Sequence, residues 1–380
     1  MTKNPLQQLH ALGQSVWLDF LERNFLAEGG LRTLIEEDAL TGVTSNPSIF
    51  EKAMGQGDAY DDGFRFYMAT AKPDAAAMEI YEAQAITDIQ DAAEDLRPVY
   101  DRLGGLDGYV SLEVSPYLAK DTQGTIDEAR RLWAAVDQPN LMVKVPGTAE
   151  GVPAVRQLVE DGLNINITLL FSQDAYKAVA DAYVSGLEAR VAAKKPIDRI
   201  ASVASFFVSR IDAKIDKAID ARVQQKDPES AALKALRGKV AIANAKLAYA
   251  WYREMIASER WQHLVAQGAM PQRLLWASTG TKDPGYPPTL YVDTLIGPET
   301  VNTMPPKTMD EFRAHGVVKE TLTQDLEGAR RVLAETERLG LDLPHVTADL
   351  VEDGVRQFAE AADKLLAAVE KKRAAFGGRN

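Results

Sequence analysis

Short runs rich in valine, leucine and isoleucine alternate with longer helical segments along most of this 380-residue chain. Such runs, bounded by turn residues and separated by helices, are typical of parallel strands. We predict eight strands, at residues 15–20, 42–45, 108–115, 141–145, 163–169, 199–208, 273–278 and 290–294. Eight strands that are each followed by helix match the count of a (β/α)8 barrel. The predicted fold class is therefore α/β, a (β/α)8 TIM barrel with additional helices.

Some helical stretches are longer than one crossover helix. We expect a helical excursion at 48–102 and C-terminal helices at 310–373. No linker rich in proline, glycine or serine divides the sequence, so we predict a single barrel domain over residues 1–380.

The chain carries 43 Lys and Arg against 55 Asp and Glu, a net charge of -12. This balance argues against nucleic acid or an anionic membrane as the main partner. Cysteine is absent, and no apolar run approaches the roughly 18 residues that a membrane span requires. We expect a cytoplasmic protein that binds small molecules, and the pattern leaves its oligomeric state open.

The usual cofactor signals are missing as well. The four histidines are far apart in sequence, and none belongs to an HExxH pair. Neither the G-x-x-x-x-G-K-[ST] nor the G-x-G-x-x-G motif occurs. We therefore expect no His-ligated catalytic metal, and a nucleotide cofactor lacks its usual sequence signal.

Lys144 stands at the centre of the run LMVKVPGT, at residues 141–148. Burial in a strand disfavours an ammonium ion and favours the free amine, which Schiff-base chemistry needs. Alternatively, a lysine near a strand end can extend to water or pair with a carboxylate. The neighbouring strands must decide between these two interpretations.

Polar residues recur where predicted strands end, and in a barrel the active site is built at those ends. Besides Lys144 they are Asp19, Asn46, Glu113, Asn166, Ser205, Arg210 and Ser278. Each has a structural explanation of its own. Asp19 or Asn46 can cap a helix, Asn164 and Asn166 can bond each other, and Arg210 can pair with Asp212. Their joint occurrence on at least six strands favours a site.

If the barrel is wound in sequence order, Glu113, Lys144 and Thr168 lie side by side on neighbouring strands. Glu113 can then relay protons through a water that Thr168 orients, while Asp19 takes a proton from a substrate hydroxyl. Sugar hydroxyls suit the amides of Asn46 and Asn166. Arg210 and Ser278 could hold a phosphate at the rim.

Six segments together resemble the transaldolase family, in its longer bacterial form within the class I Schiff-base aldolases. They are VTSNPSIF at 43–50, SLEVSP at 111–116, LMVKVPGT at 141–148, NINITLLFS at 164–172, SFFVSRID at 205–212 and WASTGTKDP at 276–284. The resemblance implies a transferase of the pentose phosphate shunt in carbohydrate metabolism, with no metal and no organic cofactor. It would move a dihydroxyacetone unit from sedoheptulose 7-phosphate to glyceraldehyde 3-phosphate, giving erythrose 4-phosphate and fructose 6-phosphate.

The resemblance also implies roles for individual residues. Lys144 matches the Schiff-base lysine, Asp19 the acid/base, and Glu113 with Thr168 the pair that positions the relay water. The expected substrate-binding residues are Asn46, Asn166, Ser205, Phe207, Arg210 and Ser278. Many relatives carry an arginine where this chain has Gly280, and Lys282 could supply that charge.

Three alternatives remain at this stage. A simpler Schiff-base aldolase on the same barrel would release dihydroxyacetone to water. A catalytically silent barrel would bind sugar phosphates or proteins, with Lys144 purely structural. A pyridoxal phosphate enzyme would also need a lysine, but the expected phosphate loop is absent.

Overall fold

Eight parallel strands form a closed barrel in the computed structural model, which describes residues 3–70 and 75–377. The strands follow one another around the barrel in sequence order, and β8 closes it by pairing with β1. Their bounds are β1 (Gln14–Leu18), β2 (Leu40–Val43), β3 (Tyr109–Glu113), β4 (Leu141–Pro146), β5 (Ile165–Leu170), β6 (Ser202–Phe207), β7 (Gln272–Ala277) and β8 (Thr300–Met304). The predicted (β/α)8 fold class is confirmed.

The predicted strand at 290–294 is wrong. Residues Leu290–Asp293 form the short helix α14, and the eighth strand is TVNTM, ten residues later. The prolines at 287 and 288 lie just before this helix, and Leu290 N donates to Pro287 O at 3.0 Å. Thr289 Oγ1 then bonds Asp293 Oδ2 at 2.7 Å, one helical turn away. This local bonding outweighs the β-propensity of Tyr291 and Val292.

Helices surround the barrel. The first group comprises α1 (Pro5–Ala11), α2 (Arg23–Ala27), α3 (Gly30–Asp38), α4 (Pro47–Gly55), α5 (Asp61–Thr70), α6 (Ala77–Arg102), α7 (Thr122–Val136), α8 (Gly151–Asp161) and α9 (Gln173–Ala192), with a 3-10 turn at Pro116–Leu118. The second comprises α10 (Ser209–Gln224), α11 (Ser230–Leu236), α12 (Val240–Ala257), α13 (Glu259–Val265), α14, α15 (Pro306–His315), α16 (Leu326–Arg338) and α17 (Leu343–Gly377).

The predicted helical excursion at 48–102 corresponds to α4, α5 and α6, although its residues 71–74 lie outside the described part of the chain. The C-terminal stretch at 310–373 falls on α15, α16 and α17. The single-domain prediction stays a prediction. Of the helices that the structure describes, none combines the length and apolar character that crossing a membrane requires.

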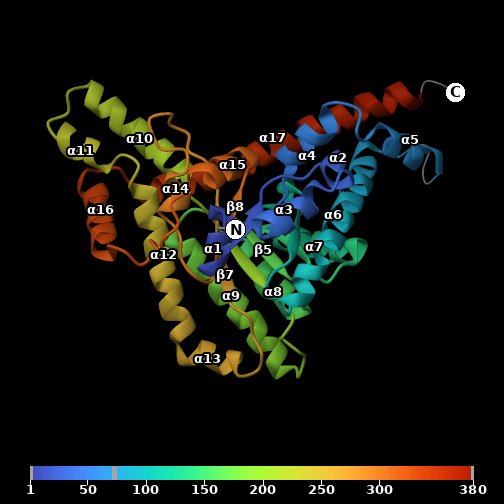
Figure 1. Ribbon diagram of the computed structural model, residues 1–380, viewed down its shortest axis with the longest axis horizontal. Helices are drawn as coiled ribbons and strands as arrows, with labels where there is room; N and C mark the ends of the chain where they lie inside the picture. Colours follow the sequence, from blue (N-terminus) through green and yellow to red (C-terminus); the bar gives the residue numbers. More distant parts are fainter. Residues whose placement is uncertain (1–2, 71–74, 378–380) are drawn as a thin grey trace.

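The long helix α17 crosses the molecule rather than joining the outer ring. Figure 1 shows it in red, running past α15 and α4 toward the C-terminus. Its strongest packing partner is α4, and it also contacts α10 and β5. A side chain at Gly354 would collide with Leu169, since an added Cβ would lie 2.6 Å from Leu169 Cδ2. Helix α17 is thus seated directly over the C-terminal end of β5.

The barrel interior is filled with side chains, and part of the filling is polar. Asn166 Nδ2 donates to Ser111 Oγ at 3.0 Å, and Asn166 Oδ1 accepts from Ser205 Oγ at 2.7 Å, which joins β3, β5 and β6. Gly42 makes room for the Trp17 indole, because an added Cβ would lie 2.3 Å from that ring. A filled interior leaves the C-terminal mouth as the place for chemistry.

Candidate active site

Lys144 lies on β4 with its Cα opposite Glu113 of β3 and Asn166 of β5. Its side chain is almost completely buried, and Nζ lies 3.2 Å from Glu113 Oε2. The amine donates its hydrogen bond to Ser45 O, also at 3.2 Å. A buried cation needs such a carboxylate partner, so the valine-rich strand can carry a lysine only because Glu113 is beside it.

Thr168 Oγ1 is buried without a hydrogen-bond partner among the described residues, and the polar contact of Glu113 Oε2 is its ion pair with Lys144. Burial raises the pKa of the Glu113 carboxyl, and the Lys144 charge opposes that shift. A carboxyl with a raised pKa holds a proton at higher pH than an exposed one, as a proton relay requires. Both oxygens suit the predicted relay water.

The predicted side-by-side arrangement of Glu113, Lys144 and Thr168 needs a correction. The neighbour of Lys144 in register is Asn166, whereas Thr168 is opposite Pro146. Thr168 therefore lies one inward-facing position nearer the barrel mouth. It lines the same cavity as Lys144.

Asp19 directly follows β1 and lines this cavity. Its Oδ1 accepts a 2.7 Å hydrogen bond from Thr44 Oγ1, and Thr44 in turn bonds Thr303. Burial raises the pKa of Asp19, while the charge of Lys144 and the Thr44 hydrogen bond lower it. Asp19 and Glu113 are thus two carboxyls in different surroundings around one lysine, an arrangement that permits separate acid/base roles.

The two predicted amide residues occupy different positions. Asn46 caps α4 through its Oδ1, which accepts from Ile49 N at 3.1 Å, and it also lines the cavity. Asn166 is fully buried beneath the cavity, between Ser111 and Ser205. The alternative in which Asn164 and Asn166 bond each other is wrong, because Asn164 bonds backbone groups of Pro139, Leu141 and Ala201.

The cavity has a volume of about 320 Å³ at the C-terminal end of the barrel. It brings together most of the predicted site residues. Its lining includes Asp19, Asn46, Lys144, Thr168, Ser205, Phe207, Arg210, Ser278, Gly280 and Lys282. Glu113 reaches it only through its contact with Lys144, since the rest of that side chain faces a neighbouring cavity beside α6 and α17.

Two cations stand at the rim of the cavity. Arg210, the second residue of α10, lies over the Phe207 ring at 5.4 Å from its centroid, and its Nη1 is buried without a partner among the described residues. Burial lowers the pKa of Lys282, and the Arg210 charge lowers it further. The expected pairing of Arg210 with Asp212 is wrong, because Asp212 bonds Tyr291 and Ala241 instead. Neighbouring cations that repel each other form a site for an anion.

Ser278 and Gly280 shape the same rim. Ser278 has a left-handed backbone, with φ of 55°, and its Oγ lies 2.9 Å from Ser209 Oγ. This strained conformation at a cavity rim is typical of functional positions. At Gly280, an added Cβ would lie 2.9 Å from Thr308 Oγ1, so little room exists there for a larger side chain.

Several cavity residues were not predicted from the sequence. Phe358, from α17, places its ring centroid 5.8 Å from Lys144 Nζ, and Lys52 of α4 adds a third cation to the lining. Thr44 and Thr303 support Asp19. Lys52 is six residues after Asn46, so the helix that Asn46 caps could have pointed to it. Phe358 carries no such local signal, because it lies more than 200 residues from Lys144.

The comparisons with known proteins agree with this geometry. A family model described as "Transaldolase/Fructose-6-phosphate aldolase" matches residues 16–369. A protein named "Transaldolase" from Trichodesmium erythraeum is 45% identical over 376 residues, which cover 98% of both chains. Another from Thiobacillus denitrificans is 48% identical over 367 residues, covering 96% of this chain and 99% of its own. A third, from Thermobifida fusca, is 46% identical over 98% of this chain and 99% of its own. The chain therefore belongs to the transaldolase/fructose-6-phosphate aldolase family.

Proposed function

We propose that this protein is a transaldolase. It transfers a dihydroxyacetone unit from sedoheptulose 7-phosphate to glyceraldehyde 3-phosphate, giving erythrose 4-phosphate and fructose 6-phosphate. The observation that carries the proposal is the buried Lys144 amine, 3.2 Å from Glu113 Oε2 in a cavity that also holds Asp19 and two rim cations. The names of the similar proteins support the same reaction.

The first half of the reaction forms the covalent intermediate. Lys144 first gives a proton to Glu113, and its free amine then attacks the ketose carbonyl carbon. The proton that the nitrogen loses passes to the carbonyl oxygen, which gives a carbinolamine. Glu113, through a water oriented by Thr168, delivers the proton that lets hydroxide leave as water. The product is an iminium ion at C2 of the ketose, whose positive nitrogen can accept the electron pair of the C3–C4 bond when that bond breaks.

The second half breaks and remakes that bond. Asp19 takes the proton from the hydroxyl on C4, the C3–C4 bond cleaves, and the aldose phosphate leaves while a three-carbon enamine stays on Lys144. The acceptor aldehyde then enters, the enamine carbon attacks it, and Asp19 returns the proton to the new alkoxide. Hydrolysis of the iminium releases the ketose product and frees Lys144.

Most of the remaining predicted residues bind substrate in this proposal. Asn46 and Ser205 contact the hydroxyls of the dihydroxyacetone unit, and Phe207 forms an apolar wall. Asn166, with Ser111, holds Ser205 in place and acts from beneath the cavity. Arg210, Ser278 and Lys282 bind the phosphate, with Lys282 supplying the charge missing at Gly280. The absence of cysteine suits a reducing compartment, and we propose the cytoplasm as the place of action.

Two measurements test this function. Borohydride reduction in the presence of fructose 6-phosphate is expected to add a three-carbon unit to Lys144, visible by peptide mass spectrometry. A coupled assay should find transfer to glyceraldehyde 3-phosphate faster than release of free dihydroxyacetone. An unmodified Lys144 in the folded protein overturns the Schiff base, and release faster than transfer identifies a simple aldolase instead.

A further inference from the structure

Helix α10 presents three carboxylates at four-residue intervals, Asp212, Asp216 and Asp220, and this spacing places them on one face. We call these three residues the acidic ladder. Two of them accept hydrogen bonds from tyrosines that follow β7. Tyr291 Oη donates to Asp212 Oδ2 at 2.9 Å, and Tyr286 Oη donates to Asp216 Oδ2 at 2.6 Å.

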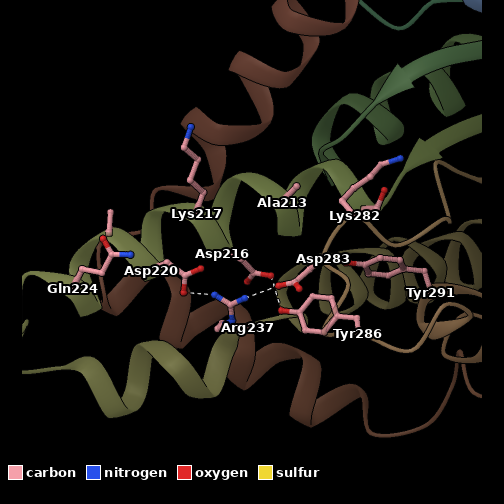
Figure 2. A pocket seen from close by; sticks show the side chains of 12 residues that line it. Ala213, Asp216, Lys217, Asp220, Gln224, Arg237, Lys282, Asp283, Tyr286 and Tyr291 are labelled. Atoms are coloured by element: carbon pink, nitrogen blue, oxygen red, sulfur yellow. Dashed lines mark hydrogen bonds and ion pairs between the residues drawn. The ribbon is translucent and has the colours of Figure 1, made fainter.

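The third carboxylate reaches the same segment through an arginine. Arg237 follows α11. One of its guanidinium nitrogens donates to Asp220, and another donates to Asp283 Oδ2 at 2.7 Å. Figure 2 shows its guanidinium between the two carboxylates, with Tyr286 beside Asp216. Each of the three carboxylates is therefore linked to the stretch 283–291. Asp212 and Asp216 are linked by tyrosine hydrogen bonds, and Asp220 is linked through Arg237.

The two connected segments each carry one of the rim cations. Arg210 lies two residues before Asp212 on α10, and Lys282 immediately precedes Asp283. Lys282 lines both the active-site cavity and the one beside the ladder, and in Figure 2 its amine points away from the Arg237 cluster. The distance between the two cations is thus set by two backbone segments that the ladder joins.

The two segments are also joined where they begin, because Ser209 N donates to Ser278 O at 3.1 Å and their Oγ atoms lie 2.9 Å apart. Further along, a cavity of about 460 Å³ lies between α10, Arg237 and the stretch 283–291. Gly238 packs closely there, since an added Cβ would lie 2.9 Å from the Tyr286 ring. A loop that borders a cavity depends on its polar bonds for a fixed position.

We propose that the acidic ladder, with Arg237, Tyr286 and Tyr291, is a positioning device that holds Arg210 and Lys282 at the spacing a phosphate monoester requires. The ladder residues act through these two cations and touch no substrate themselves. The inference rests on the proposed function, because it assigns substrate phosphate to the rim cations. It predicts that the ladder determines the preference for phosphorylated over unphosphorylated substrates.

The test uses two substitutions in the full-length protein. Tyr286→Phe removes the hydroxyl that bonds Asp216 and keeps the ring against Gly238. Arg237→Gln removes the guanidinium that links Asp220 to Asp283. Matched controls are Tyr249→Phe, whose hydroxyl bonds Pro298 O, and Arg338→Gln, whose guanidinium pairs with Glu229 and Glu335. Each variant is assayed with glyceraldehyde 3-phosphate and with unphosphorylated glyceraldehyde, and inorganic phosphate serves as a competitive probe.

We expect both ladder variants to raise the KM for glyceraldehyde 3-phosphate and the inhibition constant of phosphate by roughly three- to tenfold. The kcat and the KM for glyceraldehyde should stay within about twofold, and the controls should match the parent protein. Equal effects on both acceptors, or no effect on phosphate, overturn the ladder's role.

Lys282→Met separates the two proposals. If it weakens phosphate binding when the ladder variants do not, only the ladder fails, and if it also has no effect, the rim phosphate site fails with it. The borohydride adduct on Lys144 tests the Schiff base independently.

Discussion

Glu113 and Lys144 are register partners on β3 and β4, and their side chains meet with 3.2 Å between Glu113 Oε2 and Lys144 Nζ. The burial that raises the pKa of Glu113 also removes competing water from the amine. One buried contact therefore supplies both an ion-pair partner for the lysine and a proton carrier for its chemistry.

Glu113→Gln is expected to slow formation of the Lys144 adduct by about a hundredfold or more, because the amide cannot relay protons. Single-turnover borohydride trapping with fructose 6-phosphate measures this step. Glu82→Gln, which removes a carboxylate that pairs with Arg131 on the surface, is the control and should trap at the parent rate. Unchanged trapping in Glu113→Gln would remove Glu113 from the relay.

Asp19→Asn should separate binding from bond cleavage. The amide retains the shape of the side chain and its contact with Thr44 but cannot accept the substrate proton. We expect turnover to fall by about a thousandfold or more while the Lys144 adduct still forms, since general-base catalysis contributes on that scale. Asp38→Asn, at a carboxyl that pairs with Arg313 away from the cavity, is the matched control. Turnover near the parent value would exclude Asp19 as the acid/base.

The barrel and most of the cavity could be predicted because both depend on local patterns. Period-two alternation in strands such as GYVSLEVS places Ser111 and Glu113 on one face, and position near a strand end places side chains at the mouth. The register between strands is not local. It follows from how the whole barrel closes, which is why Asn166 rather than Thr168 is the partner of Lys144.

Long-range packing explains what the sequence could not indicate. Phe358 reaches Lys144 only because α17 packs along α4 and over β5, and its spacing within α17 gives no sign of this. The error at 290–294 has a long-range cause in addition to the local bond between Thr289 and Asp293. Tyr291 and Val292 favour a strand, but the Tyr291 hydroxyl donates a hydrogen bond to Asp212 of α10, which is about 80 residues away in the sequence.

Phe358→Ala tests whether α17 shields the intermediate from water. The ring covers Lys144 at 5.8 Å, and its loss opens the cavity to solvent that can hydrolyse the iminium before the acceptor arrives. We expect the ratio of dihydroxyacetone release to transfer to rise by roughly tenfold. Val369→Ala is the control, because this buried residue lies three turns further along the same helix, about 16 Å away. An equal ratio in both variants would mean that Phe358 does not shield the site.

Asp212 gives a prediction about stability and pH. Burial raises its pKa to about 7, against an ordinary value of 3.8, although Tyr291 and Ala241 donate hydrogen bonds to it. The folded state therefore binds a proton at Asp212 that the unfolded state has already lost between pH 4 and 7. The contribution of this group to the free energy of unfolding is complete below pH 4 and is lost as the pH rises from 4 through 7. The loss is at most about 4 kcal/mol, because one pKa unit corresponds to about 1.4 kcal/mol.

Asp212→Asn removes this titration while retaining the shape of the side chain. Urea unfolding at pH 5 and pH 8 is expected to show the variant gaining stability relative to the parent at the higher pH, since the parent alone must then bury a charge. Asp227→Asn is the opposite case. Hydrogen bonds from Glu229 N and Arg222 lower the pKa of Asp227, so its carboxyl is ionised at both pH values and its difference from the parent should stay constant. A constant difference for Asp212→Asn as well would mean that Asp212 titrates like an exposed carboxyl and that α10 does not bury a proton there.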